Sequence, residues 1–275
     1  MTPVNSAGNS PGHPAASSMV ISPSASIFAV WLRYFAVFRK DLYYGLVTTF
    51  VEPILYLGSF GFGLGSMIDH IEVDGRPLTY RAFILGGLVG QTLMFTAFFE
   101  GSYGGFIRMY YQKIFQAIAV TPVTLSEVLW GELLWCSSRA MLPAIVVLII
   151  GIAIGDLSPW GCLIFLPIGF CAAVLFASLG LFVAALSKTI ESISYPQYLL
   201  IFPMFLFCGV YFPIQQLPEP IRIGARLLPL TSVLSVAREF TLGTSYEWWA
   251  VPALLIWMGV LVFGSRRAMT RRLLA

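Results

Sequence analysis

The chain has 275 residues, of which 58% are hydrophobic and only 11% are charged. Soluble domains carry about 25% charged residues, so this composition excludes a soluble globular protein and indicates a multi-pass membrane protein. The net charge of +3 is too small to suggest a nucleic-acid partner. The two histidines and four cysteines form no metal-ligand pattern, so we predict no metal site.

Two segments precede the first long apolar stretch. Residues 1–25 are rich in Ser, Pro, Gly and Ala and lack the basic and apolar regions of a signal peptide, so we predict a disordered tail. Residues 26–43 have an aromatic face around Trp31 and a basic face around Arg33 at helical spacing. This pattern predicts an amphipathic helix at the membrane interface.

The apolar stretches suit about six spans, since each crossing of a 30 Å core takes roughly 20 residues. We predict spans at residues 45–68, 82–103, 128–154, 161–186, 195–212 and 247–264. Residues 69–81 are predicted to be a polar loop. The interval 213–246 is only partly apolar and rich in proline, so we predict two short helices there that dip into one membrane face, at residues 221–228 and 231–240.

A moderately polar segment, Arg108–Glu127, separates the second and third predicted spans and must therefore lie at one membrane face. Residues 112–120 lack Gly and Pro and are predicted to form a short helix, which Thr121-Pro122 ends. Apolar side chains at helical spacing and one offset lysine lie on it: Ile114, Phe115, Ile118, Ala119 and Lys113. Two interpretations stay open here: a linker on the membrane surface, or a helix that docks on a soluble partner.

Lys and Arg are more frequent on one side of the predicted spans, and this bias sets the orientation. With both termini in the cytoplasm, the larger set is cytoplasmic: Arg33, Arg39, Lys40, Arg108, Lys113, Lys188, Arg266, Arg267, Arg271 and Arg272. The outer set is Arg76, Arg81, Arg222, Arg226 and Arg238. The segment Arg108–Glu127 is therefore expected in the cytoplasm.

Charges inside a span cost about 2.5–3.5 kcal/mol each on insertion scales, so they need partners. Four are predicted toward the cytoplasmic half of the first three spans: Glu52, Glu100, Glu132 and Arg139. Glu132 and Arg139 share a helix face, and Glu52 or Glu100 is expected to reach Arg139 from a neighbouring helix. The cluster is either a structural ion-pair network or a set of charges that shifts during transport. A proton relay is a weaker alternative.

No nucleotide-binding loop with the pattern GxxxxGK followed by Ser or Thr occurs, and no GxSxG motif or Ser/His/Asp set is present. A chain with a docking helix but no ATP site suggests a permease whose ATPase is another polypeptide. We therefore predict that the chain is not an enzyme and binds no cofactor directly, with ATP and Mg held by the partner subunit.

Several motifs resemble the membrane subunit of type-2 ABC transporters, and within them the nodulation protein J type, the permeases of lipo-oligosaccharide export. These motifs are Glu52-Pro53-Ile54-Leu55-Tyr56 with the glycines through Gly65, Phe99-Glu100 through Arg108-Met109, Thr121-Pro122 with Gly131-Glu132, Phe202-Pro203-Met204-Phe205-Leu206-Phe207 with Gly209 and Phe212-Pro213, Leu217-Pro218, and Leu228-Pro229-Leu230. The resemblance covers roughly residues 30–265.

The resemblance implies an all-α membrane domain over residues 26–275 with six transmembrane helices. It implies an amphipathic interface helix before the first span, a cytoplasmic coupling helix after the second, and short re-entrant helices before the last. It further implies a dimer of permeases, expected to be a homodimer, on a dimer of ABC ATPases. Such a complex is expected among the lipids of the bacterial inner membrane.

The leading hypothesis is an exporter of an amphiphilic lipo-oligosaccharide- or glycolipid-like substrate. Four aromatic side chains are candidates for a path along which sugar rings or acyl chains pass, although core or lipid-facing aromatics are the plainer interpretation: Phe95, Phe98, Phe99 and Tyr103. The alternatives are a permease of the same architecture for drug-like hydrophobic molecules, and an ion-coupled secondary transporter that uses the buried carboxylates. An intramembrane enzyme is disfavoured by the lack of a catalytic set.

Overall fold

The computed structural model describes residues 22–274, except residues 41, 69, 74, 120–122 and 246. The described chain is helical apart from one β-hairpin, which agrees with the predicted all-α class. Its elements are α1 Pro23–Lys40, α2 Leu42–Tyr56, η1 Leu57–Gly63, η2 Leu64–Ser66, β1 His70–Val73, β2 Arg76–Thr79, α3 Tyr80–Phe99, η3 Glu100–Gly104, η4 Ile107–Tyr111, α4 Ile114–Ala119, α5 Leu125–Ile154, α6 Pro159–Leu186, η5 Glu191–Ile193, α7 Ser194–Pro196, η6 Gln197–Ile201, α8 Phe202–Phe207, η7 Ile214–Gln216, α9 Glu219–Leu227, α10 Pro229–Leu242 and α11 Ala250–Leu274. Most of the predicted tail lies outside the described residues, and α1 begins within its last residues.

Four helices in the described part of the chain are long and apolar enough to cross a membrane: Tyr80–Tyr111, Leu125–Ile154, Pro159–Leu186 and Ala250–Arg272. They correspond to the predicted second, third, fourth and sixth spans. The predicted first and fifth spans fall on mixed segments, α2 with η1 and η2, and α7 with η6 and α8. Glycines and prolines explain the change of helix type there, because both are poor formers of a regular α-helix. The count of six spans stays a prediction.

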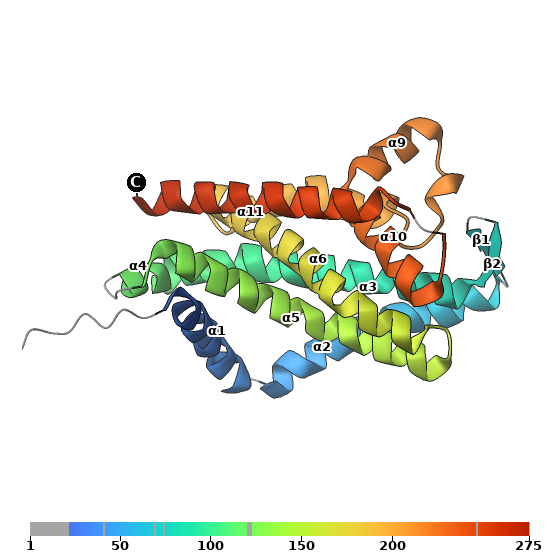
Figure 1. Ribbon diagram of the computed structural model, residues 1–275, viewed down its shortest axis with the longest axis horizontal. Helices are drawn as coiled ribbons and strands as arrows, with labels where there is room; N and C mark the ends of the chain where they lie inside the picture. The colour runs from blue at the N-terminus through green and yellow to red at the C-terminus, as the bar shows by residue number, and fades with distance from the viewer. Residues whose placement is uncertain are drawn as a thin grey trace, which may run out of the picture.

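The helix α3 lies at the centre of the bundle, with α5, α6 and α10 packed against it (Figure 1). Of the apolar window in Tyr80–Tyr111, 89% is buried, against 17% for that in α11, so α3 is the core helix and α11 is peripheral. Glycines bring the run of α3 and η3 close to α6: a Cβ at Gly101 in η3 would lie 2.6 Å from the Ala177 oxygen, and one at Gly180 would lie 2.5 Å from the Phe98 oxygen. Such close backbone contact at small residues is typical of membrane helix pairs.

The two ends of the bundle carry different elements (Figure 1). The helix α4 and the C-terminal end of α11 lie at one end, which we call the α4 end. The β-hairpin, α9 and α10 lie at the other, which we call the hairpin end. There, Arg81 donates to both carboxylate oxygens of Asp156, at 2.5 and 3.2 Å, and so ties the start of α3 to the turn between α5 and α6.

The hairpin corrects the prediction of a polar loop at residues 69–81. Strands β1 and β2 pair antiparallel, with His70 opposite Thr79 and Val73 opposite Arg76. This register leaves a two-residue turn, in which Gly75 has φ +76°, a conformation that glycine adopts without strain. The side chain of Arg76 donates to the Gly243 oxygen at 2.6 Å, which fastens the hairpin to the end of α10.

The helices α9 and α10 lie where two short helices were predicted in residues 213–246, and their entry into one membrane face stays a prediction. Both have proline in the first turn, where the missing N–H costs no hydrogen bond. The helix α10 ends at Gly243, whose φ of +67° gives the left-handed cap that glycine favours. Most residues of α10 are buried against α3, α6 and α11, so it belongs to the core of the bundle.

Single-cysteine labelling is expected to place the two ends of the bundle on opposite membrane faces. With the partly exposed Cys171 replaced by Ser, an impermeant maleimide should label Glu72→Cys in intact cells. It should label Arg271→Cys only after permeabilisation, because the Lys and Arg bias places the α4 end inside. Labelling of Arg271→Cys in intact cells would reverse the orientation, and equal labelling of both would contradict the arrangement of the ends.

Gly161→Ala is expected to separate α6 from α10. A Cβ at this position would lie 1.7 Å from the backbone oxygen of Phe240, and a backbone atom cannot rotate away. Gly259→Ala, with nothing within 4 Å of the added carbon, is the matched control. Size-exclusion profiles of detergent-extracted protein should show little folded Gly161→Ala and a normal yield of Gly259→Ala. Normal yield of both would mean that α6 and α10 do not meet as described.

Candidate functional site

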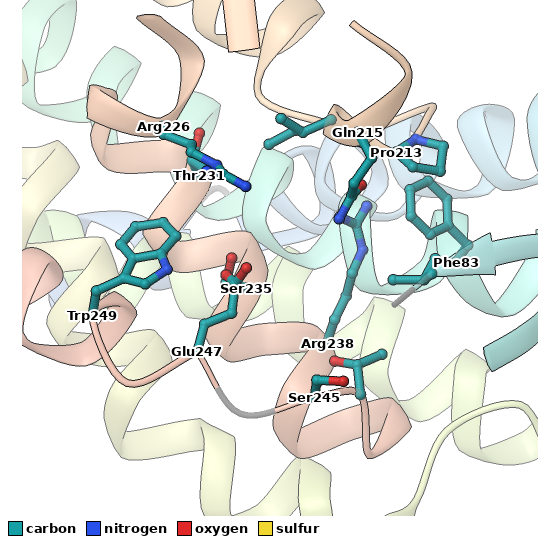
Figure 2. A pocket seen from close by; sticks show the side chains of 13 residues that line it. Phe83, Pro213, Gln215, Arg226, Thr231, Ser235, Arg238, Ser245, Glu247 and Trp249 are labelled. Carbon is teal, nitrogen blue, oxygen red and sulfur yellow. The ribbon is translucent and has the colours of Figure 1, made fainter. Parts of the chain in front are cut away.

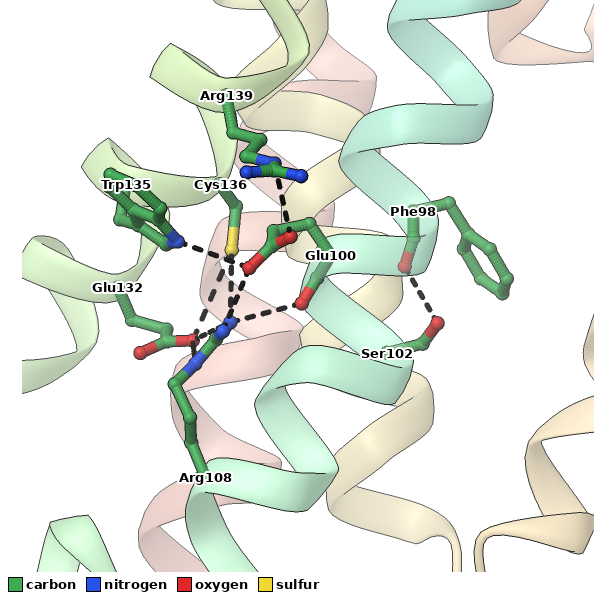
Figure 3. A network of polar contacts seen from close by, with 8 residues as sticks. All are labelled: Phe98, Glu100, Ser102, Arg108, Glu132, Trp135, Cys136 and Arg139. Atoms are coloured by element: carbon green, nitrogen blue, oxygen red, sulfur yellow. Dashed lines mark hydrogen bonds and ion pairs between the residues drawn. The ribbon is translucent and has the colours of Figure 1, made fainter. Parts of the chain in front are cut away.

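A cluster of ion pairs joins the helical run that follows α3 to α5 (Figure 3). Arg108, in η4, lies at its centre. Its Nη1 donates to Glu100 Oε1 at 2.8 Å, and its Nε donates to Glu132 Oε1 at 2.6 Å. Its Nη2 also donates to the backbone oxygen of Glu100 at 3.0 Å. One guanidinium, only 11% exposed, therefore neutralises carboxylates on two different helices.

Helical spacing and one glycine make this arrangement possible. Glu100, Gly104 and Arg108 are four residues apart in turn and share one helix face. A Cβ at Gly104 would lie 3.0 Å from both terminal nitrogens of Arg108, so a larger residue would displace the guanidinium. The turns η3 and η4 around it are π-helical, and such turns often occur at functional sites.

A second arginine is held more loosely. The Nε of Arg139 lies 3.7 Å from Glu100 Oε2, and its guanidinium lies 4.4 Å from the ring centre of Phe38. Trp135 Nε1 donates to Glu100 Oε1 at 3.1 Å. Glu100 is thus bound by several donors, whereas Oε2 of the fully buried Glu132 has no hydrogen-bond partner in the described structure. Arg108 is the cation on which Glu132 depends.

The helix α1 packs on α5 beside this cluster. Val30 and Tyr34 are its buried apolar side chains, and a Cβ at Gly131 would lie 2.7 Å from Val30 Cβ. The guanidinium of Arg108 lies 5.1 Å from the ring centre of Tyr34. Trp31 Nε1 donates to the Ser138 hydroxyl at 3.2 Å. Large apolar side chains on the rest of α1, among them Phe28 and Phe35, are exposed, as the prediction of an interface helix requires.

The sequence predicted these charges better than it predicted their pairing. Glu100, Glu132 and Arg139 come together, but Glu132 pairs with Arg108 and not with Arg139. Arg108 was expected at the start of a polar segment; the helical run continues to Tyr111, and the Arg108 side chain is only 11% exposed. Its cytoplasmic location stays a prediction. The spacing of Glu100, Gly104 and Arg108 is the signal that would have identified it.

Glu52 does not join the ion pairs; of the two carboxylates expected to reach Arg139, Glu100 is the one that does. Its side chain is exposed on α2 and forms no ion pair with a described residue. It does line a cavity of about 280 Å³ together with Glu100 and Arg139. A further cavity of about 620 Å³ reaches Arg108 and Arg139 from the side of α1. The charge cluster therefore borders open space on two sides.

The four aromatic residues proposed as a path have packing partners. Phe98 is fully buried, and the ring of Phe95 lies 5.3 Å from that of Phe205 in α8. The Tyr103 hydroxyl donates to Gln197 Oε1 at 2.8 Å. Phe99 stacks on Phe95 and lines the same cavity as Glu52. The contacts of Phe95 and Tyr103 reach the segment η6–α8, and passage of a substrate there stays a prediction.

The predicted docking helix is present as α4, directly after the charge cluster. Ile114 and Phe115 are 6% and 2% exposed, so they pack inside this chain. Lys113 is exposed and has φ +50° at the break between η4 and α4. The side chains of Ile118 and Ala119 lie outside the described ones. Contact of α4 with a partner stays a prediction, and the exposed side chains nearby are those of Tyr111, Gln112, Lys113 and Ala117.

The fold and the site define a multi-pass helical membrane protein in which a buried charge cluster lies next to a short surface helix. The family model for the ABC-2 type transporter matches residues 25–241. Nodulation protein J of Rhizobium meliloti (strain 1021) is 33% identical over 217 residues, which cover 78% of this chain and 81% of that protein. Nodulation protein J of Rhizobium leguminosarum bv. trifolii is 31% identical over 261 residues, which cover 94% of this chain and 98% of that protein.

A more distant relative is the inner membrane transport permease YadH of Escherichia coli (strain K12), which is 23% identical over 216 residues, 78% of this chain and 84% of that protein. The chain belongs to the ABC-2 type transporter family, and within it the chain is similar to permeases of the nodulation protein J type. This result confirms the resemblance seen in the sequence motifs.

Arg108→Ala is expected to destabilise the protein by about 3–5 kcal/mol, because it leaves the buried Glu132 without its cation. Arg139→Ala is the control: its ion pair is longer, at 3.7 Å, and its side chain is 23% exposed, so its loss should cost less. Thermal unfolding of purified protein measures both. In the double variant Arg108→Met, Glu132→Gln, part of the stability should return because no unpaired charge remains. Equal losses for Arg108→Ala and Arg139→Ala would contradict the central role of Arg108.

Proposed function

We propose that this chain is the membrane-spanning subunit of an ATP-driven exporter, and that a separate ABC ATPase binds at the α4 end. Family membership supports the transport role. The observation that carries the coupling is the single helical run Tyr80–Tyr111, which ends next to α4 and is fixed to α5 through Arg108. A partner that displaces α4 would move this run as one rigid element. The continuous helix and the ion pairs of Arg108 allow little movement of its parts relative to one another.

In this proposal the permease acts as a dimer, expected to be a homodimer, in the bacterial inner membrane. Both termini lie in the cytoplasm, and ATP and Mg are bound by the ATPase. The exposed residues next to α4 give the partner a contact surface. Tyr111 is the largest of them, with 68% of its surface exposed, so it replaces the buried Phe115 as the expected anchor.

The proposed substrate is an amphiphilic lipo-oligosaccharide- or glycolipid-like molecule. Two cavities meet at Arg139: an apolar one of about 330 Å³ between α1 and α5, and a more polar one of about 280 Å³ that includes Thr92 and Thr96. An apolar compartment beside a polar one suits a molecule with an acyl part and a sugar part. A drug-like hydrophobic molecule would use only the apolar cavity.

Tyr111→Ala is expected to weaken binding of the ATPase by about 2 kcal/mol, roughly 30-fold, because interface energy concentrates in a few aromatic anchors. Tyr198→Ala is the matched control, since Tyr198 is 64% exposed but lies on η6. The measurement is the amount of ATPase that copurifies with tagged permease from the native host. Lys113→Ala should matter less and depend on salt. Full ATPase binding in Tyr111→Ala would exclude this surface.

Substrate choice is tested with the same complex in inside-out vesicles. ATP-dependent uptake of a fluorescent lipo-oligosaccharide should fall in Thr92→Val, Thr96→Val, because this change removes the hydroxyls of the polar cavity. Uptake of a hydrophobic dye is the control and should not change. Uptake of the dye but not of the lipo-oligosaccharide by the wild type would favour the drug-efflux alternative.

A further inference from the structure

A second buried arginine lies at the hairpin end of the bundle, and Figure 2 shows its surroundings from close by. Arg238, on α10, is only 8% exposed. Its Nη2 donates to the backbone oxygens of Gly209 at 2.5 Å and Val210 at 3.3 Å, and its guanidinium carbon lies 3.9 Å from the ring centre of Phe83. No described carboxylate forms an ion pair with it, and its buried Nε has no hydrogen-bond partner.

Glycines of α3 make the room for this side chain. A Cβ at Gly86 would lie 2.9 Å from Arg238 Cγ, and one at Gly87 would lie 3.2 Å from its Nη2. A permanently charged guanidinium is therefore accommodated against an otherwise apolar helix. Such burial is costly for an arginine that forms no ion pair.

Arg238 also lines a cavity of about 50 Å³ between α9, α10 and the segment before α11. One water needs about 10–15 Å³, so the cavity has room for one small oxyanion. Polar side chains surround it, with Trp249 at one side (Figure 2): Gln215, Arg226, Thr231, Ser235, Thr244, Ser245 and Glu247. Within the described structure, the side chains of Arg226, Ser235 and Glu247 form no hydrogen bond or ion pair.

The charges around the cavity do not cancel. Arg226 and Arg238 are cationic and Glu247 is anionic, so a single positive charge remains among the residues that line it. The Nη1 of Arg238 donates to no described residue, since both hydrogen bonds of this guanidinium come from Nη2. A singly charged oxyanion between the two guanidinium groups would balance the site and accept charge-assisted hydrogen bonds.

We propose that this cavity binds a singly charged oxyanion, a carboxylate or a phosphodiester. Nη1 of Arg238 and the guanidinium of Arg226 are its cationic donors, and the Ser235 hydroxyl is a neutral donor. The oxyanion arrives either as a free anion or as the headgroup of an anionic lipid. The site lies at the opposite end of the bundle from α4, and it does not depend on the proposed ATP-driven step.

The test uses the full-length permease in nanodiscs of phosphatidylcholine, with sodium acetate as the probe and sodium chloride at equal ionic strength as the reference. The thermal unfolding midpoint should rise with acetate and saturate, because a ligand that binds the native state stabilises it. In Arg226→Gln the half-saturating acetate concentration should rise at least about tenfold, since a charge-assisted contact is lost. Arg222→Gln should behave as the wild type, because Arg222 lies on the same helix but pairs with Glu219 at 3.7 Å.

Equal midpoints of the wild type in acetate and chloride would overturn the proposal. Equal acetate responses of Arg226→Gln and Arg222→Gln would overturn it as well. Arg226 is exposed, so its variant is expected to fold even where a substitution of Arg238 does not. Ser235→Ala should also weaken the acetate response.

Nanodiscs that contain phosphatidylglycerol distinguish the two sources of the oxyanion. Loss of the acetate response there would assign the site to a lipid headgroup, because the headgroup already occupies it. A response that persists would assign the site to a free anion. Both outcomes require the saturable response in phosphatidylcholine, and its absence there refutes the site.

Discussion

The structure depends on one guanidinium, that of Arg108, which binds carboxylates from two helices and is only 11% exposed. A buried ion pair seldom adds net stability over apolar packing, but the loss of one partner is costly. The pairing therefore adds little to the free energy of folding. Its main effect is to set the register between the run after α3 and α5. Any other register would leave the fully buried Glu132 without Arg108, its ion-pair partner, and would therefore be destabilised.

The helical run Tyr80–Tyr111, which joins α3, η3 and η4, is organised by its glycines as much as by its apolar side chains. Gly86 and Gly87 make room for Arg238, Gly101 allows contact with α6, and Gly104 gives Arg108 its place. In each case a Cβ would meet either a backbone atom or an arginine side chain. The most buried helix of the bundle thus accepts two arginines near its opposite ends, and the cost of those charges explains why small residues occur where they do.

Sequence predicted most of the fold because length and composition decide whether a helix spans a membrane. The helices α5 and α6 lie within a few residues of their predicted bounds, and prolines correctly indicated α9 and α10. The hairpin was missed although Asp74-Gly75 is a typical hairpin turn, because its strands are short and polar. Within the site, charges inside apolar stretches were found, whereas Arg108 was placed in a polar segment between spans and Arg238 in a short helix that dips into one membrane face. Their burial follows from tertiary packing, which local sequence does not show.

The packing also indicates which parts of the subunit move together. Val30 on Gly131 fixes α1 to α5, Arg108 fixes the run after α3 to α5, and the contact at Gly101 fixes it to α6. These four elements, α1, the run of α3 to η4, α5 and α6, are expected to move as one body. Sliding of one past another would break buried ion pairs or cause steric clashes between backbones. The segments α2 and η6–α8 make fewer contacts with it. We therefore expect a substrate path to open between this unit and those segments, where the aromatic contacts of Phe95 and Tyr103 exchange more easily than an ion pair.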